Sequence, residues 1–562
     1  MKVYLKGKGE ITLTQKNYLA QGGEGTVWVH GNSVLKIYHD PANMIPVDKI
    51  IELSELTDPH IIKPNDIVFD AKGKVIGYAM SFVKDTYALC QFFPKAFRDR
   101  NGISPDMALA LVRKLQDLIK HIHDHHILVV DLNEMNFLLS RDFKEIFAID
   151  CSSYQTTHYP ATAIMESVRD RHLKTFSELT DWFSFGIVSF QMFSSIHPYK
   201  GKHLTVKGLD ERMEKNISVF NKDVSVPATC YPFNLIPRAY LDWYKAVFED
   251  GKRMPPPVDL NVAAVAAIVQ VKKIIGSNNF IMAELINFAE NIIKAKVVNG
   301  DRIVLTDKWL YLNKRQLCEI KPNCEIIYAP KIGTVIMATI IGENLYLYNA
   351  TYKREIPISL IAHDMMEYGG RLYIKSYANI LEIDFNEIGN EIIPSFKVVG
   401  NILEHAAQFF DGVVVQNLLG NYFVSLLPES GKCYQIKIKE FDGYRIIDAK
   451  FDKGVLMAVG TKAGKYNKFI LRFDAIPNEY DIRMVMDIHY DGLNFTTTDG
   501  GLCVHLTENE EIEIFSARRG SAQIKIIDDA AIDGNMLLYN NGNKIEFAKG
   551  NGLHSISTKG QP

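Results

Sequence analysis

The chain has 562 residues, of which 47% are hydrophobic and 23% are charged, and its formal net charge is −3. This length predicts two or more domains of ordinary globular composition. The nearly balanced charge gives no basic surface for nucleic acid and no acidic tail, and without a run of ~18 uninterrupted apolar residues we expect no membrane span.

The cysteines and the first residues bear on the compartment. Seven cysteines are scattered without a C-x-x-C pair, which favours free thiols in a reducing environment. The opening residues M-K-V-Y-L-K-G-K-G-E lack the apolar run of a signal peptide. We therefore expect a cytoplasmic protein.

The first motif is a cluster of small residues between two strand-like runs. Residues 19–27 read L-A-Q-G-G-E-G-T-V, with the candidate ligand-facing positions Ala20, Gly22, Gly23, Gly25 and Val27. Small residues let a hairpin backbone close over phosphate groups with its N–H groups pointing inward. An ordinary glycine turn fits the same letters. An apolar strand follows at 34–37 and carries a single lysine, Lys36.

Three further elements lead to the centre of this region. Apolar residues at helical spacing predict a helix over 47–56, and a second, strongly amphipathic helix is predicted over 105–123. Residues 76–83 read I-G-Y-A-M-S-F-V, which is typical of a buried strand. An ordinary core strand is one interpretation of this run, and a strand that leads into a ligand-contacting linker is the other.

The central stretch carries two acidic residues and an asparagine, each at the end of an apolar strand. A predicted strand at 127–130 ends at Asp131, and Asn136 follows five residues later. A predicted hairpin turning at 141–142 ends at Asp150. Side chains at the ends of neighbouring strands can converge, and phosphoryl transfer needs such a set: a carboxylate to orient a hydroxyl, and an amide and a carboxylate to hold Mg²⁺ on ATP.

Four histidines, His121, His123, His125 and His126, invite a metal site. They lie at the end of a predicted helix, where polar and cationic groups suit the helix dipole, and we favour that interpretation. Further on, an apolar helix begins with Asp181, which as a helix cap needs no other role.

Taken in order, these motifs resemble the protein kinases, and most closely a divergent bacterial family of Ser/Thr-type kinases. The resemblance rests on L-A-Q-G-G-E-G-T-V, V-L-K, V-V-D-L-N-E-M-N, I-D-C-S-S-Y-Q, D-W-F-S-F-G and H-P-Y-K-G, and it covers roughly residues 10–258. The resemblance implies a bilobal α+β domain over 1–258 that uses ATP and Mg²⁺. Some members of the family occur with a phosphatase and a von Willebrand-type protein, which are possible partners.

The resemblance also implies roles for individual residues. Lys36 binds phosphates, Asp131 accepts the substrate proton, Asn136 and Asp150 hold magnesium, and Asp181 ties down the catalytic loop. Adenine is expected against the linker residues Met80, Phe82 and Val83. The helix acid that pairs with Lys36 is missing from its usual place, which Lys49 occupies, and of the neighbouring acids Asp48 and Glu52 we favour Glu52.

Other departures concern the catalytic loop itself. Val129 and Val130 replace the usual His-Arg, so we expect no activation by phosphorylation of the activation segment. Asn133 stands where a phosphate-contacting lysine is usual, and it is our candidate for that catalytic position. Cys151 and Ser152 replace Phe-Gly after the magnesium aspartate.

The pattern of apolar and turn residues changes in the second half of the sequence. After three prolines at 255–257, the segment 259–299 is predicted to be a helical connector with helices at 260–275 and 282–297. Short β-rich runs then recur about every 40 residues, which predicts an all-β domain over 300–556, a β-propeller of six or seven blades. A pair of β-sandwiches or an irregular β domain is the alternative. A propeller of this kind most often binds a protein.

Three functions remain open at this point. The leading one is an ATP- and Mg²⁺-dependent Ser/Thr-type protein kinase whose propeller recruits an unknown protein substrate or a regulator. The second is a pseudokinase that binds nucleotide and acts as a scaffold through protein–protein interaction. A small-molecule kinase is the third, and the helix that begins at Asp181 counts against it.

Overall fold

The computed structural model describes residues 1–5, 9–161, 163–258, 277–329, 333–388, 391–474, 476–490 and 492–559. The chain divides into two compact units, and the bulk of the first is Met1–Arg98 with Ile103–Val271. The bulk of the second is Lys272–Lys462 with Tyr466–Pro562. Among the described residues, no helix is long and apolar enough to cross a membrane.

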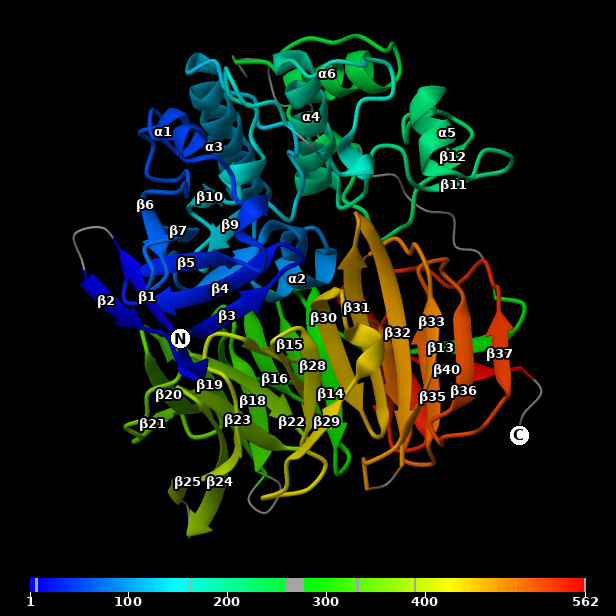
Figure 1. Ribbon diagram of the computed structural model, residues 1–562. Coiled ribbons are helices and arrows are strands. Elements are labelled where there is room, and N and C mark those ends of the chain that lie inside the picture. The colour runs from blue at the N-terminus through cyan, green and yellow to red at the C-terminus, as the bar shows by residue number, and fades with distance from the viewer. Residues whose placement is uncertain are drawn as a thin grey trace. The chain divides into compact units, whose positions relative to one another are not determined.

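The first unit begins with a seven-stranded antiparallel sheet in the order β2-β1-β6-β7-β5-β4-β3 (Figure 1). Its strands are β1 (Lys2–Leu5), β2 (Gly9–Thr12), β3 (Tyr18–Gln21), β4 (Gly25–His30), β5 (Ser33–Tyr38), β6 (Asp66–Phe69) and β7 (Val75–Ser81). The short helix α1 (Val47–Leu53) lies between β5 and β6 in the chain. The strands expected on both sides of the glycine cluster and at Lys36 are confirmed, because β3, β4 and β5 occupy those positions.

The rest of this unit is mainly helical and surrounds a small sheet with the order β10-β9-β8. Its elements are α2 (Lys95–Arg100), α3 (Pro105–Asp124), α4 (Glu178–Ser194), α5 (Leu209–Glu214), α6 (Arg238–Phe248), β8 (Thr86–Ala88), β9 (Phe137–Ser140), β10 (Ile146–Ala148), β11 (Lys202–His203) and β12 (Val224–Ser225). The predicted helix 105–123 is confirmed, and Ser104 caps it by accepting a hydrogen bond from the Met107 N–H.

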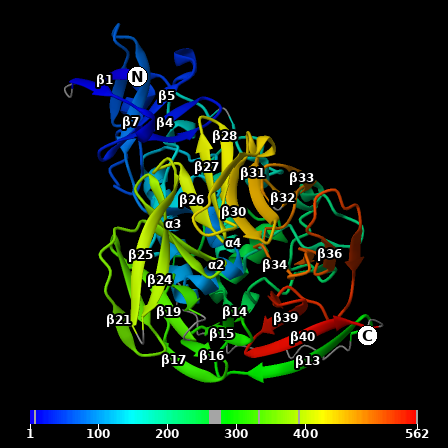
Figure 2. The ribbon, with the colours of Figure 1, turned by 90° about the horizontal axis from the view of Figure 1, so that it is seen from below.

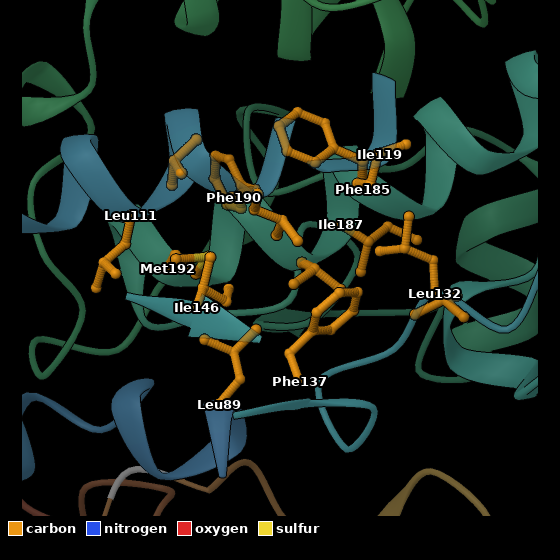
Figure 3. Close-up of a cluster of buried hydrophobic side chains, with 14 of the residues drawn as sticks. Leu89, Leu111, Ile119, Leu132, Phe137, Ile146, Phe185, Ile187, Phe190 and Met192 are labelled. Carbon is orange, nitrogen blue, oxygen red and sulfur yellow. The ribbon is translucent and has the colours of Figure 1, made fainter. Parts of the chain in front are cut away.

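One large apolar core holds these elements together. Figure 3 shows side chains from α3, α4, β9 and β10 gathered in this core, among them Ile119 of α3, Phe185 and Phe190 of α4, Phe137 of β9 and Ile146 of β10. Because α4 is buried along almost its whole length, it forms the central support of this part of the unit. The hairpin β9–β10 lies against this core. Asn136 directly precedes β9 and Asp150 follows β10, so both lie at the open end of the hairpin.

One predicted strand is absent from the described chain. Residues 127–130 make only an isolated bridge between Leu128 and Gln155, and no ladder. The reason is that the N–H groups of Val129 and Val130 donate to the Asp181 carboxylate instead of to a neighbouring strand. An apolar run of four residues does not distinguish these two cases.

The described residues of the second unit form seven antiparallel sheets of four strands each. Six of them use consecutive strands: β14 (Ile292–Val298), β15 (Asp301–Thr306), β16 (Trp309–Leu312), β17 (Arg315–Glu319); β18 (Glu325–Ala329), β19 (Thr334–Ile341), β20 (Asn344–Asn349), β21 (Arg354–Ile356); β22 (Asp364–Tyr368), β23 (Arg371–Ser376), β24 (Asn379–Ile388), β25 (Glu391–Asn401); β26 (Ala407–Phe410), β27 (Val413–Leu418), β28 (Asn421–Leu426), β29 (Tyr434–Lys437); β30 (Arg445–Asp452), β31 (Val455–Lys462), β32 (Lys465–Phe473), β33 (Tyr480–Val485); and β34 (Phe495–Thr497), β35 (Leu502–Leu506), β36 (Ile512–Ser516), β37 (Ile524–Ile527).

The seventh sheet joins the two ends of this unit. It contains β38 (Leu537–Asn541), β39 (Lys544–Lys549) and β40 (Gly552–Thr558), and its fourth strand is β13 (Phe280–Asn287), the first strand of the unit. β13 pairs antiparallel with β40 from Phe280–Thr558 to Asn287–Gly552, and the two strands lie side by side in Figure 2.

Each sheet is linked to the next one along the chain, and the seventh is linked to the first. Polar contacts make six of the links: Lys296 Nζ to Ile326 O, Lys375 Nζ to Ala407 O, Phe451 N to Asp411 O, Lys450 Nζ to Phe495 O, Leu538 N to Asn494 Oδ1 and Arg302 Nη2 to Glu546 Oε1. A shared apolar cluster that includes Ile336 and Ile374 makes the remaining one.

The predicted helical connector is partly corrected. Its first helix, 260–275, lies outside the described residues. The second, 282–297, is wrong, because these residues form β13 and β14. Phe280, Met282 and Ile286 of β13 point toward the apolar clusters of the unit. This alternation was hidden in the sequence by further apolar residues on the exposed face of the strand. The β region accordingly begins at Phe280 and its last strand ends at Thr558, beyond the predicted limits of 300 and 556.

Candidate functional site

The loop that carries Asp131 is anchored by one buried carboxylate. Asp181 is fully buried, and its Oδ2 accepts hydrogen bonds from the Val129 N–H at 2.7 Å and from His123 Nε2 at 2.9 Å, while its Oδ1 accepts from the Val130 N–H at 3.0 Å. The helix cap is Ser177, four residues earlier, so Asp181 is not the cap of α4. Its side chain instead fixes the backbone directly before Asp131.

Asp131 and Asn136 are held against each other. The Asn136 side-chain amide donates to the backbone carbonyl of Asp131 at 2.9 Å and to its Oδ2 at 3.2 Å. The other carboxylate oxygen, Oδ1, accepts a 2.8 Å hydrogen bond from the backbone N–H of Met165. Since the amide nitrogen of Asn136 is used in this way, its amide oxygen is the atom left for a further ligand.

Asn133 has a different environment from the one expected of a phosphate-contacting residue. It is 1% exposed, its Nδ2 donates to the Asp131 carbonyl at 3.2 Å, and its Oδ1 accepts from the Met135 N–H at 2.8 Å. Both ends of its amide therefore support the turn between Asp131 and Asn136. The structure assigns Asn133 to the framework of the loop.

Asp150 lies beside this loop at the end of the hairpin. The Ile149 N–H donates to the Asn136 carbonyl at 2.9 Å, which brings the two candidate magnesium ligands onto adjacent chain segments. Asp150 adopts a left-handed backbone conformation with φ 59°, and its Oδ1 accepts from Ser152 Oγ at 2.7 Å. A positive φ at a residue other than glycine is uncommon and is often found at functional sites.

Lys36 reaches this acidic group from the sheet. Its Nζ lies 3.6 Å from Asp150 Oδ1 and 3.3 Å from Glu24 Oε2, and it also lies over the rings of Tyr38 and Tyr78 at 5.1 and 5.9 Å. Burial disfavours the charged ammonium, but the oxygens of Tyr78, Asp150, Tyr38 and Glu24 outweigh it and raise the pKa of Lys36. The side chain is therefore a fixed cation near the candidate metal ligands.

Helix α1 does not supply the expected acid. Glu52 accepts a hydrogen bond from His158 Nδ1 at 2.7 Å, and within the described chain the carboxylates within 4.0 Å of the Lys36 ammonium are those of Glu24 and Asp150. The inward position of the helix holds Lys49, which is 5% exposed and donates to the Ser152 carbonyl at 2.8 Å. The expected pairing of Glu52 with Lys36 is thus not the one that the structure contains, because Glu52 lies on the turn of α1 that faces His158.

The glycine cluster forms the tight end of the hairpin β3–β4. Ala20 pairs with Val27 across this hairpin, and Val27 is in turn the register partner of Lys36 on β5. The Gly22 N–H donates to the Gly25 carbonyl at 2.9 Å, while Gly23 lies at the tip of the turn. A side chain at Gly25 would place its Cβ 2.5 Å from the Ile37 carbonyl oxygen, so only glycine fits there.

The expected linker follows β7. Met80 pairs with Val34 in the sheet, the Phe82 N–H donates to the Asn32 carbonyl at 3.0 Å, and Met80, Phe82 and Val83 are all half-buried. Met80 therefore lies near the end of β7, two residues after Tyr78, the register partner of Lys36, and Phe82 and Val83 follow the strand directly.

Two structural contacts were missed by the sequence reasoning. His123 joins Asp181 in the loop anchor, although we considered it only as a metal ligand or dipole partner. Asp170 makes a buried, two-point ion pair with Arg253, at 2.5 Å to Nε and 2.8 Å to Nη2. The local sequence signal for Asp170 is the charged triplet R-D-R at 169–171. This triplet does not identify Arg253, 83 residues away, as the partner of Asp170.

The chemistry of the site is that of hard oxygen ligands. The Asp150 carboxylate, 47% exposed, and the Asn136 amide oxygen are the ligand types that Mg²⁺ prefers, with the remaining positions left to water or phosphate oxygens. Throughout the described ranges, no group of three or more His, Cys, Asp or Glu side chains is arranged to hold a metal ion. His125 instead bonds the His121 carbonyl at 2.8 Å as part of the end of α3.

Comparison with known proteins gives two curated relatives. Protein kinase YegI of Escherichia coli (strain K12) is 25% identical over 275 residues, which cover 43% of this chain and 42% of the relative. Protein kinase YegI of Escherichia coli O157:H7 is 24% identical over 258 residues, which cover 40% of each. The aligned part of the chain thus spans less than half the length of the curated relatives it matches.

Other comparisons add less. No protein-family model matches the chain. Among solved structures, the ROP18 kinase domain in complex with AMP-PNP and sucrose is 15% identical and covers 47% of this chain and 82% of its own length, with a TM-score of 0.33. This TM-score is too low for a residue-by-residue comparison of sites. The similarity in sequence to protein kinase YegI supports a divergent protein kinase-like family for the matched part of the chain.

Proposed function

We propose that this chain is an ATP- and Mg²⁺-dependent protein kinase of the Ser/Thr type. The observation that carries the proposal is the convergence of Lys36, Asp131, Asn136 and Asp150 at one place, through the contacts of Asn136 with Asp131, of Ile149 with Asn136 and of Lys36 with Asp150. These contacts join strands and loops that are distant in the sequence, and a chain without phosphoryl chemistry has little need of all four groups.

Each residue has a role that follows from its contacts. Lys36 is a fixed cation, which suits it to hold phosphate oxygens beneath the hairpin β3–β4. The Asp131 carboxylate, held by the loop that Asp181 anchors, orients a substrate hydroxyl and accepts its proton. Asn136 and Asp150 would hold Mg²⁺ through oxygen atoms. Bound magnesium would neutralise charge that develops on the transferred phosphoryl group.

The adenine end of the nucleotide is expected against the end of β7 and the residues that follow it. Met80, Phe82 and Val83 are the candidate contacts, with Ala20 and Val27 on the hairpin as the opposite wall. Gly22, Gly23 and Gly25 would leave the backbone close to the phosphates. In this proposal the nucleotide lies against the part of the sheet where Val27, Lys36 and Tyr78 are in register across β4, β5 and β7.

The test is transfer of labelled phosphate from ATP and Mg²⁺ to the protein itself and to a generic protein substrate. Asp131→Asn and Asp150→Asn should each lower transfer by about 10²-fold or more, in line with the loss of a general base or a metal ligand. Asp117→Asn, on the exposed side of α3, is the matched control. Equal transfer by Asp131→Asn and the control would exclude the proposed role of Asp131.

Two contacts of Asp131 favour a second candidate, a pseudokinase that binds nucleotide and works as a scaffold. Both carboxylate oxygens of Asp131 already accept hydrogen bonds, from Asn136 and from Met165, so a substrate hydroxyl has to share an oxygen with one of these donors. Nucleotide binding that needs Lys36 but is unchanged by Asp131→Asn, together with no phosphate transfer by the wild type, would favour this candidate.

For the second unit we propose a seven-bladed β-propeller that binds the protein substrate or a regulator. The closed succession of seven four-stranded sheets supports it, with β13 completing the last sheet beside β40. Ser555→Pro would remove a donor from the inner strand β40. Hydrogen exchange should then speed up in β13 as well as in β40, while Ser555→Ala leaves both protected. Unchanged protection of β13 in the proline variant would contradict this closure.

A further inference from the structure

The Lys36 ammonium pairs with an acid on the glycine-rich turn, and not with the acid expected on helix α1. Its ammonium lies 3.3 Å from the carboxylate of Glu24, which belongs to the glycine-rich turn between β3 and β4. Its other acidic neighbour is Asp150 at 3.6 Å. If Asp150 is used to hold magnesium, Glu24 is the carboxylate that remains for Lys36.

Helix α1 is occupied by other contacts and does not compete. Its inward side chain is Lys49, a second cation, whose Nζ donates to the Ser152 carbonyl. Its acid, Glu52, bonds His158 through both the imidazole and the backbone N–H, at 2.7 and 3.5 Å. Turning α1 to bring Glu52 to Lys36 would break these contacts and leave the largely buried ammonium of Lys49 without its carbonyl partner.

The turn that carries Glu24 is attached firmly to β5, the strand of Lys36. The Glu24 carbonyl accepts from the His39 N–H at 2.9 Å, and the His39 imidazole contacts the Gly23 carbonyl at 3.3 Å and Thr26 Oγ1 at 3.2 Å. Gly25 packs directly on the Ile37 carbonyl, where no side chain fits. Backbone contacts on both sides of Glu24 thus hold its side chain over Lys36, although that side chain is 65% exposed.

We propose that Glu24 is the positioning residue of Lys36, so that the acid which orders the phosphate-binding lysine lies on the glycine-rich turn instead of on helix α1. This inference rests on the proposed function and names one more residue of the same site. It has a consequence for the nucleotide: the phosphates and the Glu24 carboxylate are both anions that face one ammonium, so Glu24 orders Lys36 at some expense to phosphate affinity.

The contact itself is tested without any catalysis. A water-soluble carbodiimide joins a lysine amine directly to a carboxylate that touches it, and the joined peptides are identified by mass spectrometry. In the full chain we expect a link between the peptides of Lys36 and Glu24, and we expect Glu24→Gln to abolish it. A link from Lys36 to Glu52, or to Asp150 alone, would overturn the proposal even if the chain transfers no phosphate.

The positioning role of Glu24 is tested by measuring kcat and the KM for ATP separately. Glu24→Gln should lower kcat for phosphate transfer about tenfold, as loss of one positioning contact does, and should leave the KM for ATP unchanged or lower. Glu24→Asp, which keeps the charge on a shorter side chain, should restore part of kcat. Glu55→Gln, an exposed acid after α1, is the control.

The possible outcomes separate the two levels of the proposal. A larger loss of kcat in Glu52→Gln than in Glu24→Gln would assign the positioning role to the helix and overturn the inference. A wild-type chain without phosphate transfer would contradict the proposed function, while the carbodiimide link would still decide whether Glu24 pairs with Lys36. A parallel loss of kcat and rise of KM in Glu24→Gln would indicate loss of folding or of nucleotide binding instead.

Discussion

The backbone N–H of Met165 donates a 2.8 Å hydrogen bond to Oδ1 of Asp131, across 34 residues of sequence. Asp131 is the candidate catalytic base, and this N–H occupies an acceptor site on one of the two carboxylate oxygens that a substrate hydroxyl would use. The segment after Asp150 therefore acts directly on the group that would receive the substrate proton.

Removing this N–H should raise the rate of phosphate transfer several-fold. Met165 has φ −68°, a value that proline adopts without strain, so Met165→Pro deletes the donor and keeps the backbone path. Met165→Ala, which keeps the N–H and removes only the side chain, is the matched control. Transfer that falls in Met165→Pro but not in Met165→Ala would mean that the contact positions Asp131 instead of restraining it.

Replacing Asp181 should weaken the whole first unit. Asp181→Asn keeps the size of the side chain but turns one acceptor oxygen into an NH₂ group that faces a backbone N–H. We expect a loss of about 1–3 kcal/mol in the free energy of unfolding, the cost of a buried donor without an acceptor. Urea unfolding of the full chain, followed by the fluorescence of the first unit's tryptophans, measures it. Asp117→Asn should unfold like the wild type, and an equally stable Asp181→Asn would contradict the anchoring role.

The pair Asp170–Arg253 should be sensitive even to a conservative change. Arg253 bonds both carboxylate oxygens and also lies 4.4 Å from the centre of the Phe183 ring, and both charged side chains are almost fully buried. Arg253→Lys keeps the charge but loses the two-point geometry, at an expected cost of about 2 kcal/mol in the free energy of unfolding.

Arg238→Lys provides the comparison for this prediction. Arg238 pairs with Asp242 on an exposed face of α6, where both side chains are about half exposed. Its replacement should cost less than ~0.5 kcal/mol. Equal losses in the two variants, measured by chemical unfolding, would mean that the burial of the Asp170 pair adds nothing.

The second unit should lose stability as the pH falls, through His505. Burial and the charge of Lys468 lower the pKa of His505 to about 4 from its ordinary 6.5, although Glu513 and Glu508 act in the opposite direction. Between these two pH values the unfolded chain binds a proton that the folded chain does not, so the free energy of unfolding decreases on acidification. His505→Gln should make this decrease shallower.

The measurement is thermal unfolding of the full chain from pH 7 down to about pH 4. His30→Gln, at an exposed histidine, should follow the wild-type curve. The neighbouring Glu513, whose pKa is lowered to about 2 by its bonds to His505 and Arg483 in spite of burial, gives a separate loss below its ordinary pKa. An identical pH dependence in wild type and His505→Gln would contradict the assignment.

The local elements of the first unit could be predicted because their signals are local. The helix at 105–123, the strand of Lys36 and the hairpin at 141–142 all carry their own periodicity or turn residues. The strand expected at 127–130 could not be judged in this way, because the partner of its N–H groups is Asp181, about 50 residues later. The same limit hid the ion pair of Asp170, whose partner is 83 residues away.

The expected pairing of Lys36 is a different kind of case. The resemblance to kinases directed attention to α1, where Glu52 was the available acid. What decides the pairing is the position along α1 from which each side chain starts. Lys49 and Glu52 are one turn apart on this short helix, and the turn of Lys49 is the one that faces the site. In the second half, the spacing of glycines indicated repeated β units, but β13 carries no such spacing because its partner is the last strand of the unit.

The pairing of β13 with β40 has a consequence for biosynthesis. β13 leaves the ribosome before the other described strands of its unit, and its ladder is formed by β40, which is synthesised after all the remaining sheets. During that interval β13 has an open edge, and such edges attract other chains. The seventh sheet cannot be completed until β40 has left the ribosome, so we expect ribosome-stalled chains that lack β40 to need a chaperone, whereas released chains that include Thr558 should not.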